Sequence, residues 1–531
     1  MVQFPNKRKI ARLSRDRNFL LKASLFLVAI SLILALAVSL STQKSTGDHA
    51  KPAVSKLNSF SRFASVIRNP GLERGPHTAE DSRFLKRQTA SPEQGRKNQP
   101  SRSILKTITA SDHLDESEKQ LLTSLYQGLR VPDRRSSAIE KLTALPENTR
   151  FRNEFLGDIY LISKKNDQAL AHYLAEGNTF PDARYSQRSA LLELWRNQDF
   201  AQLNSLLSRP GFRGCLRAGE LMPILTDSRN FPGLLRATFQ QSLDQFQFPE
   251  IFPPLFTALI WSLIFFSFSS VTGRTVTLSV TAFLLGVISA CLTLFTLMIQ
   301  ERIQGFTFDP TDSALSQIIY FVAGVGLREE GMKLLCFVPM AIWILPRKND
   351  LEGLILAGMV GLGFASEENF SYFQNAFDHT VVWSRFLTAN ALHFSLTGVS
   401  GYFFFRMLVG KGRGWENFLT NFLIAVTAHG LYDALISMPA LESYSVLGLI
   451  ALALIAYRYF DLLRDHLDID GLHLRLSPLG VFVLGSAVLL CSTLIFSAGL
   501  TSFGQAFGTF AMSVGGMIPL AFAFISRFRD I

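Results

Sequence analysis

Long apolar runs recur along most of the chain, and each is about as long as a helix that crosses a bilayer. Such a helix needs roughly 20 mainly apolar residues, and we count about ten runs by this criterion. They lie near residues 23–41, 251–272, 277–299, 317–345, 352–373, 385–409, 417–438, 443–460, 478–499 and 502–526. The pattern predicts an all-α fold, a polytopic membrane helix bundle.

The region between the first two runs has a different pattern. Residues 43–110 are rich in Ser, Lys, Arg, Gln and Pro and show no helical or strand period, which predicts a disordered linker. Residues 111–247 regain apolar positions at three- and four-residue spacing, as helical hairpins do. Two stretches there align at an offset of 32, with Ala169 over Ala201, and the first resembles a tetratricopeptide repeat. Such a domain would offer a concave surface to a protein or peptide partner, whereas an ordinary helical bundle is the alternative interpretation.

Basic residues gather at alternate ends of the apolar runs, which indicates the cytoplasmic side because Lys and Arg resist translocation. The residues assigned to this side are Lys7, Arg8, Lys9, Arg12, Arg15, Arg17, Arg274, Arg347, Lys348, Lys411, Arg413, Arg458, Arg464, Arg475, Arg527 and Arg529. Arg302 and Arg385 are the exceptions. The amino terminus is therefore predicted to be cytoplasmic and residues 43–247 extracytoplasmic.

These patterns divide the chain into five parts: a basic tail with the first span (1–42), the linker (43–110), the extracytoplasmic helical domain (111–247), a membrane core (248–460), and a cytoplasmic loop with two C-terminal spans (461–531). The first span could instead be a cleaved signal peptide, since Ala35, Leu36 and Ala37 form a small-residue pattern near its end. Its length favours an uncleaved anchor, because it matches the thickness of a bilayer.

Composition agrees with a membrane protein. Hydrophobic residues make up 48% of the 531 residues and charged residues only 18%, with 46 Phe. A soluble protein of this length is usually less apolar. The formal net charge of +10 follows largely from the basic cytoplasmic loops, so it requires no nucleic-acid partner.

Three charged residues interrupt the run at 317–345: Glu329, Glu330 and Lys333. A charge at the centre of a membrane helix costs about 2.5 to 3.5 kcal/mol, so three such charges indicate a function. Glu329 and Lys333 are four residues apart and can pair on one helical face. Glu330 points in a direction about 100° away from Glu329 around the helix axis, so Glu330 is available to another partner.

Three further runs carry polar groups of the kind that hydrolyse bonds. They are Glu368 and Asn369 in the first, His393 in the second, and His429 with Asp433 in the third. Each alone is typical of a hydrogen bond between helices. With a rise of 1.5 Å per residue, however, Glu330, Glu368 and the two histidines lie about 8 to 20 Å from the outer ends of their runs. This similar depth in four consecutive helices favours a shared site.

The spacing of these residues resembles the PrsW family of intramembrane proteases, which are related to the CAAX prenyl endopeptidases. The resemblance covers about residues 250–460 and rests on Glu-Glu-x-x-Lys, Phe-x-x-x-Glu-Asn-x-x-Tyr, His-x-x-x-Thr-Gly and His-x-x-x-Asp. In this chain the motifs are carried by Glu329, Glu330, Lys333, Phe364, Glu368, Asn369, Tyr372, His393, Thr397, Gly398, His429 and Asp433. The resemblance implies an endopeptidase that cleaves membrane-associated proteins in a bacterial inner membrane.

Peptide hydrolysis needs an activated water, a proton donor for the leaving amine and donors for the oxyanion. Glu329 or Glu330 is the predicted general base, and His393, His429 and Asn369 are the predicted oxyanion donors. Glu368 would share the water, or would join His393 and His429 in a zinc site of the His2Glu type. A mechanism without metal explains the paired glutamates equally well, so the sequence leaves the cofactor open between zinc and none.

Two other classes of protein also carry charges within the membrane. A proton- or ion-coupled transporter predicts an inverted repeat with broken helices in both halves, and the sequence shows no such symmetry. A non-catalytic membrane scaffold predicts that the glutamates can be replaced by Gln without loss of function.

Overall fold

The computed structural model describes residues 7–48, 60–69, 103–246, 252–269, 272–375, 380–410, 414–466 and 476–529. Within these residues every regular element is a helix, which confirms the all-α prediction. The chain divides into two compact units, one of residues 49–220 and one of residues 1–48 and 221–531.

The unit of residues 49–220 is built from short helices. They are α3 (Phe60–Arg68), α5 (Ser103–Thr109), α6 (Glu116–Arg130), η4 (Pro132–Arg134), α7 (Arg135–Thr143), α8 (Arg152–Ile162), α9 (Asn166–Thr179), α10 (Arg184–Arg196), α11 (Phe200–Leu207), α12 (Pro210–Arg213) and the start of α13 (Ala218–Asp227). Several neighbours in sequence pack against each other, such as α6 with α7 and α8 with α9.

The hairpins α8/α9 and α10/α11 turn in the same way. Lys164 and Gln198 occupy the turns with φ of 59° and 58°, and they are 34 positions apart. In this register the fully buried Ala169 corresponds to Leu203, which is also fully buried, whereas Ala201 is exposed. The predicted offset of 32 was therefore wrong by two residues. The period of 34 is that of tetratricopeptide repeats, and the assignment to that class stays a prediction.

Three described segments of the predicted linker are helical: the end of α2 (Arg17–Asp48), α3 and α5. The amphipathic helix α3 buries Phe63 and Ile67 in the core that α6 and α8 share, and α5 packs against α6. At the end of α3, Arg68 pairs with Glu154 and Asp158 of α8, at 2.8 and 2.7 Å. The structure thus differs here from the expectation of a linker without helices, because burial of one apolar face stabilises a helix of only nine residues.

The unit of residues 1–48 and 221–531 holds the longer helices. They are α1 (Lys7–Leu13), α2 (Arg17–Asp48), α14 (Phe231–Gln245), α15 (Phe252–Ser267), α16 (Gly273–Arg302), α17 (Ala314–Ile319), the π-helix η5 (Tyr320–Gly326), α18 (Leu327–Ile344), η6 (Leu345–Arg347), α19 (Asp350–Asn375), α20 (Thr380–Leu387), α21 (Ala389–Leu408), α22 (Gly414–Ser437), η7 (Pro439–Tyr444), α23 (Ser445–Asp465), α24 (Pro478–Leu500) and α25 (Phe503–Arg529).

Among the described residues, five helices are long and apolar enough to cross a membrane, and α25, which is bent, would be a sixth. The five are Arg17–Ser41, Gly273–Arg302, Gly414–Ser437, Pro439–Asp465 and Pro478–Leu500. The other predicted runs also contain helices. However, α15 has only 16 residues, α18 carries buried charges, and α19 carries two partly buried glutamates. The run at 385–409 is divided between α20 and α21. A count of about ten spans stays a prediction.

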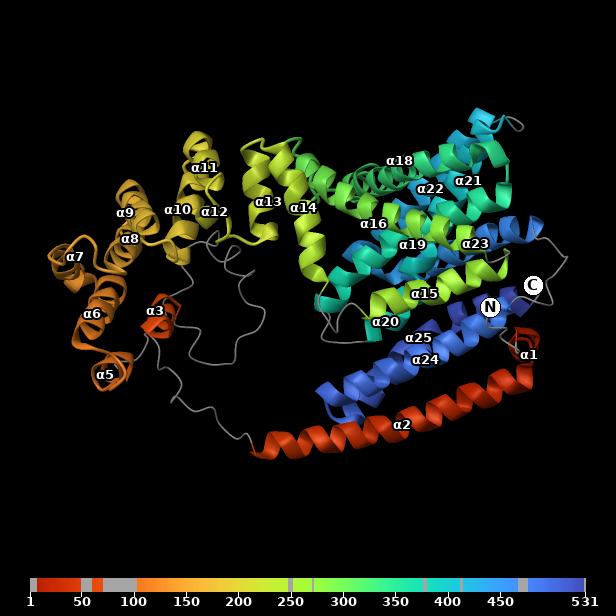
Figure 1. The fold of residues 1–531 in the computed structure, drawn as a ribbon, viewed down its shortest axis with the longest axis horizontal. Helices are drawn as coiled ribbons and strands as arrows, with labels where there is room; N and C mark the ends of the chain where they lie inside the picture. Colours follow the sequence, from red (N-terminus) through yellow and green to blue (C-terminus); the bar gives the residue numbers. More distant parts are fainter. Residues whose placement is uncertain are drawn as a thin grey trace. The chain divides into compact units, whose positions relative to one another are not determined.

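Glycines let the central helices approach closely. α19 packs against α16 and α21, while α22 packs against α21 and η5 (Figure 1). A Cβ atom at Gly363 of α19 would lie 2.0 Å from the carbonyl oxygen of Phe283 on α16. A Cβ atom at Gly361 would lie 2.3 Å from the carbonyl oxygen of His393 on α21. Small residues of this kind are typical of helix contacts in membranes, where close packing drives association.

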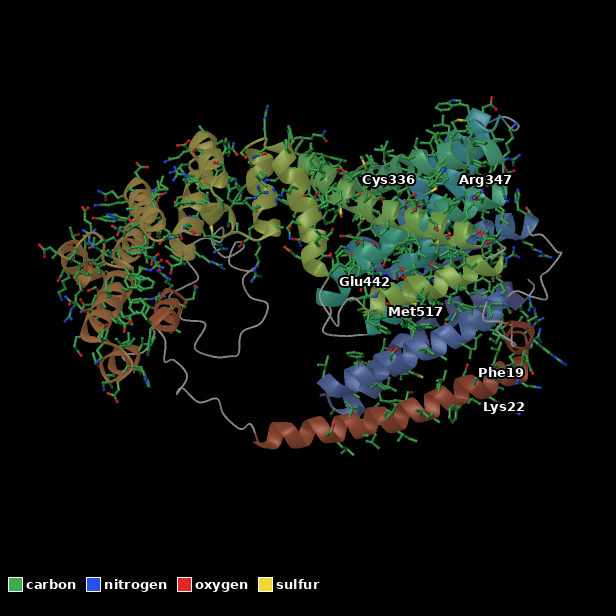
Figure 2. The ribbon with its side chains drawn as sticks, in the orientation of Figure 1. Phe19, Lys22, Cys336, Arg347, Glu442 and Met517 are labelled. Carbon is green, nitrogen blue, oxygen red and sulfur yellow. The ribbon has the colours of Figure 1, made fainter. Side chains whose placement is uncertain are left out.

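The first long helix packs along the carboxyl-terminal pair. α2 lies beside α24 (Figure 1), and Ser39 accepts a hydrogen bond from the backbone N–H of Phe503 at the start of α25. Large apolar side chains such as Phe19, labelled in Figure 2, remain exposed on α2. Exposed apolar side chains along a long helix are suited to lipid.

Candidate active site

A π-helix places the two adjacent glutamates. η5 leads directly into α18, and its Gly326 lies so close to α22 that a Cβ atom there would be 2.4 Å from the carbonyl oxygen of Val426. Gly430 of α22 faces η5 in turn, with Val322 Cα 2.4 Å from the position of an added Cβ. π-Helical turns occur frequently at functional sites. Here the close contact holds the first turn of α18 against α22.

Lys333 lies at the centre of the polar cluster. Its side chain is 0% exposed, and its Nζ donates to Glu330 Oε1 and to His393 Nδ1, at 2.8 Å each. The predicted partner Glu329 is farther, at 3.5 Å, so Glu330 is the closer partner of the lysine. The ring of Phe364 covers the ammonium group at 4.0 Å. Because an ammonium group only donates, His393 Nδ1 accepts and Nε2 carries the ring proton.

Glu330 has partners on both oxygens. Besides the lysine, Oε1 faces His429 Nδ1 at 2.9 Å, and Oε2 accepts from Thr397 Oγ1 at 3.2 Å. The carboxylate is 1% exposed. With Nδ1 of His429 directed to Glu330, Nε2 faces Glu329 Oε2 at 3.4 Å and Asp433 Oδ2 at 3.5 Å. Glu330 therefore orients His429, and Glu329 is the more accessible of the two glutamates, with a side chain 14% exposed.

A second set of hydrogen bonds extends from His393. Its Nε2 lies 3.0 Å from Glu368 Oε2, and the same oxygen accepts from Arg385 Nη2 at 2.8 Å. Arg385 Nε donates to Asn369 Oδ1 at 2.5 Å, and Asn369 Nδ2 donates to Asn390 Oδ1 at 2.8 Å. The set thus links α19, α20 and α21.

All the residues predicted for the site belong to one connected network of hydrogen bonds and ion pairs. They are Glu329, Glu330, Lys333, Glu368, Asn369, His393, His429 and Asp433. Arg385 and Asn390 also belong to it and were missed. For Arg385 a signal existed, since it is one of the two exceptions to the distribution of basic residues. Asn390 has no motif that distinguishes it.

The neighbouring carboxylate of Glu367 points elsewhere. It accepts a hydrogen bond from Ser242 of α14, at 2.5 Å. A second contact joins the same two helices, because Gln245 Nε2 donates to Ser371 Oγ at 3.0 Å. Glu367 therefore fastens α14 to α19 and takes no part in the network around Lys333.

The network holds more acids than cations. Its ionisable groups, besides the two histidines, are four carboxylates and two cations, namely Glu329, Glu330, Glu368, Asp433, Lys333 and Arg385. When all are ionised and both imidazoles are neutral, an excess of two negative charges remains. Protons or a divalent cation would balance it.

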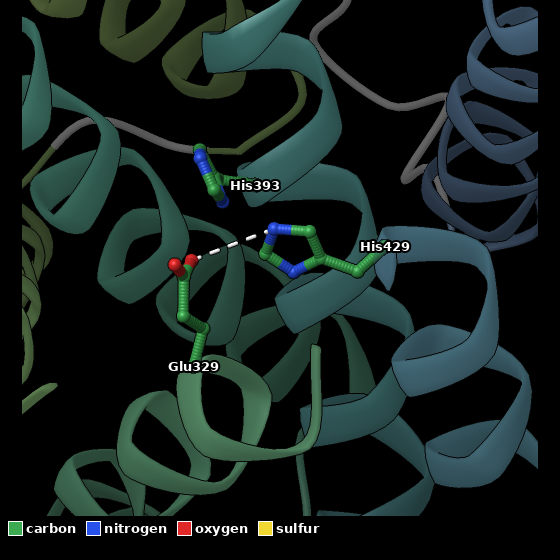
Figure 3. Close-up of side chains that lie close together, drawn as sticks. All are labelled: Glu329, His393 and His429. Atoms are coloured by element: carbon green, nitrogen blue, oxygen red, sulfur yellow. Dashed lines mark ion pairs between the residues drawn. The ribbon is translucent and has the colours of Figure 1, made fainter. Parts of the chain in front are cut away.

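Three side chains from three helices converge at one point (Figure 3). Ligand atoms of Glu329, His393 and His429 all lie within 4.8 Å of one another. The predicted zinc set had Glu368 in place of Glu329, but Glu368 bonds to His393 and Arg385 and is outside this group. Two imidazoles and a carboxylate are a common donor set for zinc.

The hydrogen bonds of His429 suit a metal ligand, whereas those of His393 would have to change. His429 gives Nδ1 to the carboxylate of Glu330, the arrangement that usually orients a metal-binding imidazole. Both ring nitrogens of His393 already have partners, Lys333 at Nδ1 and Glu368 at Nε2, so one of these contacts must be given up before His393 can ligate. The cluster can therefore hold either a water between carboxylate and imidazole or a cation.

Residues 274–458, about a third of the chain, match the model of the PrsW family intramembrane metalloprotease. No curated protein and no solved structure was found to match the chain. The predicted resemblance is thus confirmed over these residues, which include every residue predicted for the site. The matched segment supports intramembrane proteolysis, and together with the apolar helices it supports a multi-pass membrane protein.

Proposed function

We propose that this chain, whose residues 274–458 match a family of intramembrane proteases, is an endopeptidase that hydrolyses peptide bonds of membrane-associated protein substrates. The observation that carries the proposal is the convergence of Glu329, His393 and His429 within 4.8 Å, among helices that are otherwise largely apolar. Buried acids and imidazoles are costly there, and together they supply the groups that activate water.

Within this proposal Glu329 is the carboxylate that holds the attacking water. Glu330 has Lys333, His429 and Thr397 on its two oxygens, so it has little capacity left for a water molecule. The contacts of Glu329 are longer, and its side chain is partly exposed. Its carboxylate can therefore take a proton from a water placed between it and His429.

The other groups orient and protonate. Asp433 and Glu330 fix the ring of His429 from two sides, so that its Nε2 faces the place of reaction. When both ring nitrogens carry a proton, His429 can deliver the Nε2 proton to the leaving amine, the role of a general acid, and the proton that Glu329 takes from the water can replace it. Glu368 holds the ring of His393 through Nε2.

A divalent metal is compatible with the donor set, and Glu329, His393 and His429 would hold it. When bound, such an ion lowers the pKa of a water and polarises a carbonyl group. Glu329 would then be a ligand, and Glu368, whose side chain is 30% exposed, would be the carboxylate left to accept a proton. Glu329 is thus either a metal ligand or the general base, and only the first role makes activity sensitive to a chelator.

The proposed setting is the inner membrane of a bacterial cell, with the amino terminus in the cytoplasm and residues 43–247 outside. The distribution of Lys and Arg supports this orientation. The helical hairpins of residues 103–220 would then bind the part of a substrate protein that lies outside the membrane. Their tetratricopeptide-like period supports a peptide or protein as the partner.

The test is cleavage of a generic transmembrane peptide by the full chain purified in detergent. We expect Glu329→Gln to remain folded and to lose cleavage about 10²- to 10⁴-fold, the usual contribution of a general base. Glu352→Gln is the matched control, because Glu352 lies on α19 and pairs with Arg347 away from the network. Wild-type cleavage by Glu329→Gln would refute the proposed role.

A chelator separates the two mechanisms. Activity that disappears with a strong chelator and returns with zinc makes Glu329 a ligand. Activity that survives the chelator makes Glu329 the base. If the wild-type protein cleaves no transmembrane peptide under either condition, the proposal of a protease fails.

A further inference from the structure

Arg385 is a cation that the proposed mechanism does not yet use. It lies on α20, near the carboxyl-terminal half of α19, and its side chain is 15% exposed. Arg385 is also one of the two exceptions to the distribution of basic residues, so topology does not explain it. Its charge beside the proposed site therefore needs another explanation.

The guanidinium group is held rigidly, yet part of it is unused. Nε donates to Asn369, Nη2 donates to Glu368, and Cζ lies 3.6 Å from the centroid of the Tyr372 ring. A guanidinium has five N–H groups, and these hydrogen bonds occupy two. The remaining three have no acceptor among the residues that the structure describes. The side chain of Arg385 is 15% exposed, so it is not fully enclosed.

Arg385 lies within reach of the converging side chains. Its Nη2 and the imidazole Nε2 of His393 bind the same oxygen of Glu368, at 2.8 and 3.0 Å. The two nitrogens are therefore no farther apart than the sum of these distances. His393 in turn has a ligand atom within 4.8 Å of those of Glu329 and His429, so the guanidinium borders the converging side chains.

The other candidate donors are less suitable. Lys333 is fully enclosed by Glu330, His393 and the ring of Phe364, so a substrate has no path to it. Asn369, which the sequence suggested as an oxyanion donor, is 0% exposed and bridges Arg385 to Asn390. Asn369 has the contacts of a positioning residue.

We propose that Arg385 is a catalytic residue that donates hydrogen bonds to the scissile carbonyl oxygen and stabilises the oxyanion formed when water attacks. The role rests on the proposed peptidase function. Asn369 and the ring of Tyr372 position the guanidinium, and Glu368 holds it beside His393. A fixed cation in a site of low polarity stabilises developing negative charge without reorganisation.

The test compares Arg385→Lys and Arg385→Gln with the wild type in the same peptide-cleavage assay. We expect kcat to fall about 10²- to 10³-fold in Arg385→Gln, the loss usual for an oxyanion donor, with KM changed less than about threefold. Arg385→Lys keeps the charge but loses the planar fork, so its kcat should be intermediate. Arg347→Gln, which removes the partner of Glu352 at the other end of α19, is the matched control.

A tetrahedral mimic distinguishes catalysis from structure. A phosphinate analogue of the cleaved peptide should bind Arg385→Gln more weakly by the same factor as kcat/KM falls, whereas the unmodified peptide should bind as it does to the wild type. Equal losses of affinity for both peptides, or an unchanged kcat, would overturn the role of Arg385. If Arg385→Gln cleaves normally while Glu329→Gln does not, this inference fails and the peptidase function stands.

Discussion

The buried pair of Glu330 and Lys333 allows a quantitative prediction about stability. Both side chains are 0% exposed, and their charged atoms are 2.8 Å apart. Removing one partner of a buried pair leaves an uncompensated charge and usually costs about 3 to 5 kcal/mol. We therefore expect Glu330→Gln to destabilise the bundle by about this amount, because Lys333 keeps only a carboxylate at 3.5 Å and a neutral imidazole.

The double variant tests the physical cause. Lys333→Met alone should also cost about 3 to 5 kcal/mol, because it leaves the carboxylate of Glu330 without its cation. Combining Glu330→Gln with Lys333→Met removes both charges, so the cost of the double variant should be well below the sum of the single costs. The expected coupling is on the order of 2 to 3 kcal/mol, the upper part of the range for residues in contact.

The measurement is reversible unfolding in mixed detergent micelles, followed by circular dichroism, for the four proteins of the cycle. Glu329→Gln is the control for removal of a carboxylate from the same turn. It should cost no more than about 1 kcal/mol, as for a partly exposed ion pair, because Glu329 lies 3.5 Å from the lysine and has a side chain 14% exposed. Single costs that simply add in the double variant would refute the buried pair as the cause.

Three further predictions concern packing, the domains and the orientation. Gly430→Ala should destabilise the bundle by about 1 to 3 kcal/mol, because the added methyl group meets the backbone of η5. Gly331→Ala has nothing within 4 Å of the added methyl group, so it should stabilise α18 by about 0.5 to 1 kcal/mol. Thermal unfolding of both variants gives the comparison, and equal effects would contradict the prediction. Deletion of residues 49–220 should leave cleavage of the generic peptide near the wild-type rate. Deletion of residues 49–245 should lower the rate, because the contacts of α14 with α19 are lost. Equal rates for the two deletions in detergent would show that these contacts do not affect cleavage. Alkaline phosphatase fused after residue 247 should be active, and an inactive fusion would reverse the proposed orientation.

Much of the helical scaffold could be predicted because its signals are local. Apolar length identifies α2, α16 and α24 without knowledge of their neighbours, and charges inside such runs mark Glu329, Glu330 and Lys333 as exceptional. The failures were of a different kind. The helix α3 has too few residues to be stable alone, so its formation depends on the core that it joins. The offset between the two hairpins could be found only from the positions of their turns in the structure, at Lys164 and Gln198.

The sequence by itself determined that these helices suit a membrane and that four of them carry acids and imidazoles, since both follow from residue type and spacing. Only the tertiary structure decided how those groups are paired. Helical spacing allows Lys333 to meet either glutamate, and the position of His393 and His429 on other helices makes Glu330 its closer partner. The same packing saturates Glu330, leaves Glu329 more open, and brings Arg385 to Glu368. Hydrogen bonds between helices depend on distances of a few tenths of an ångström, and these are set by how the helices pack rather than by the order of residues along any one of them.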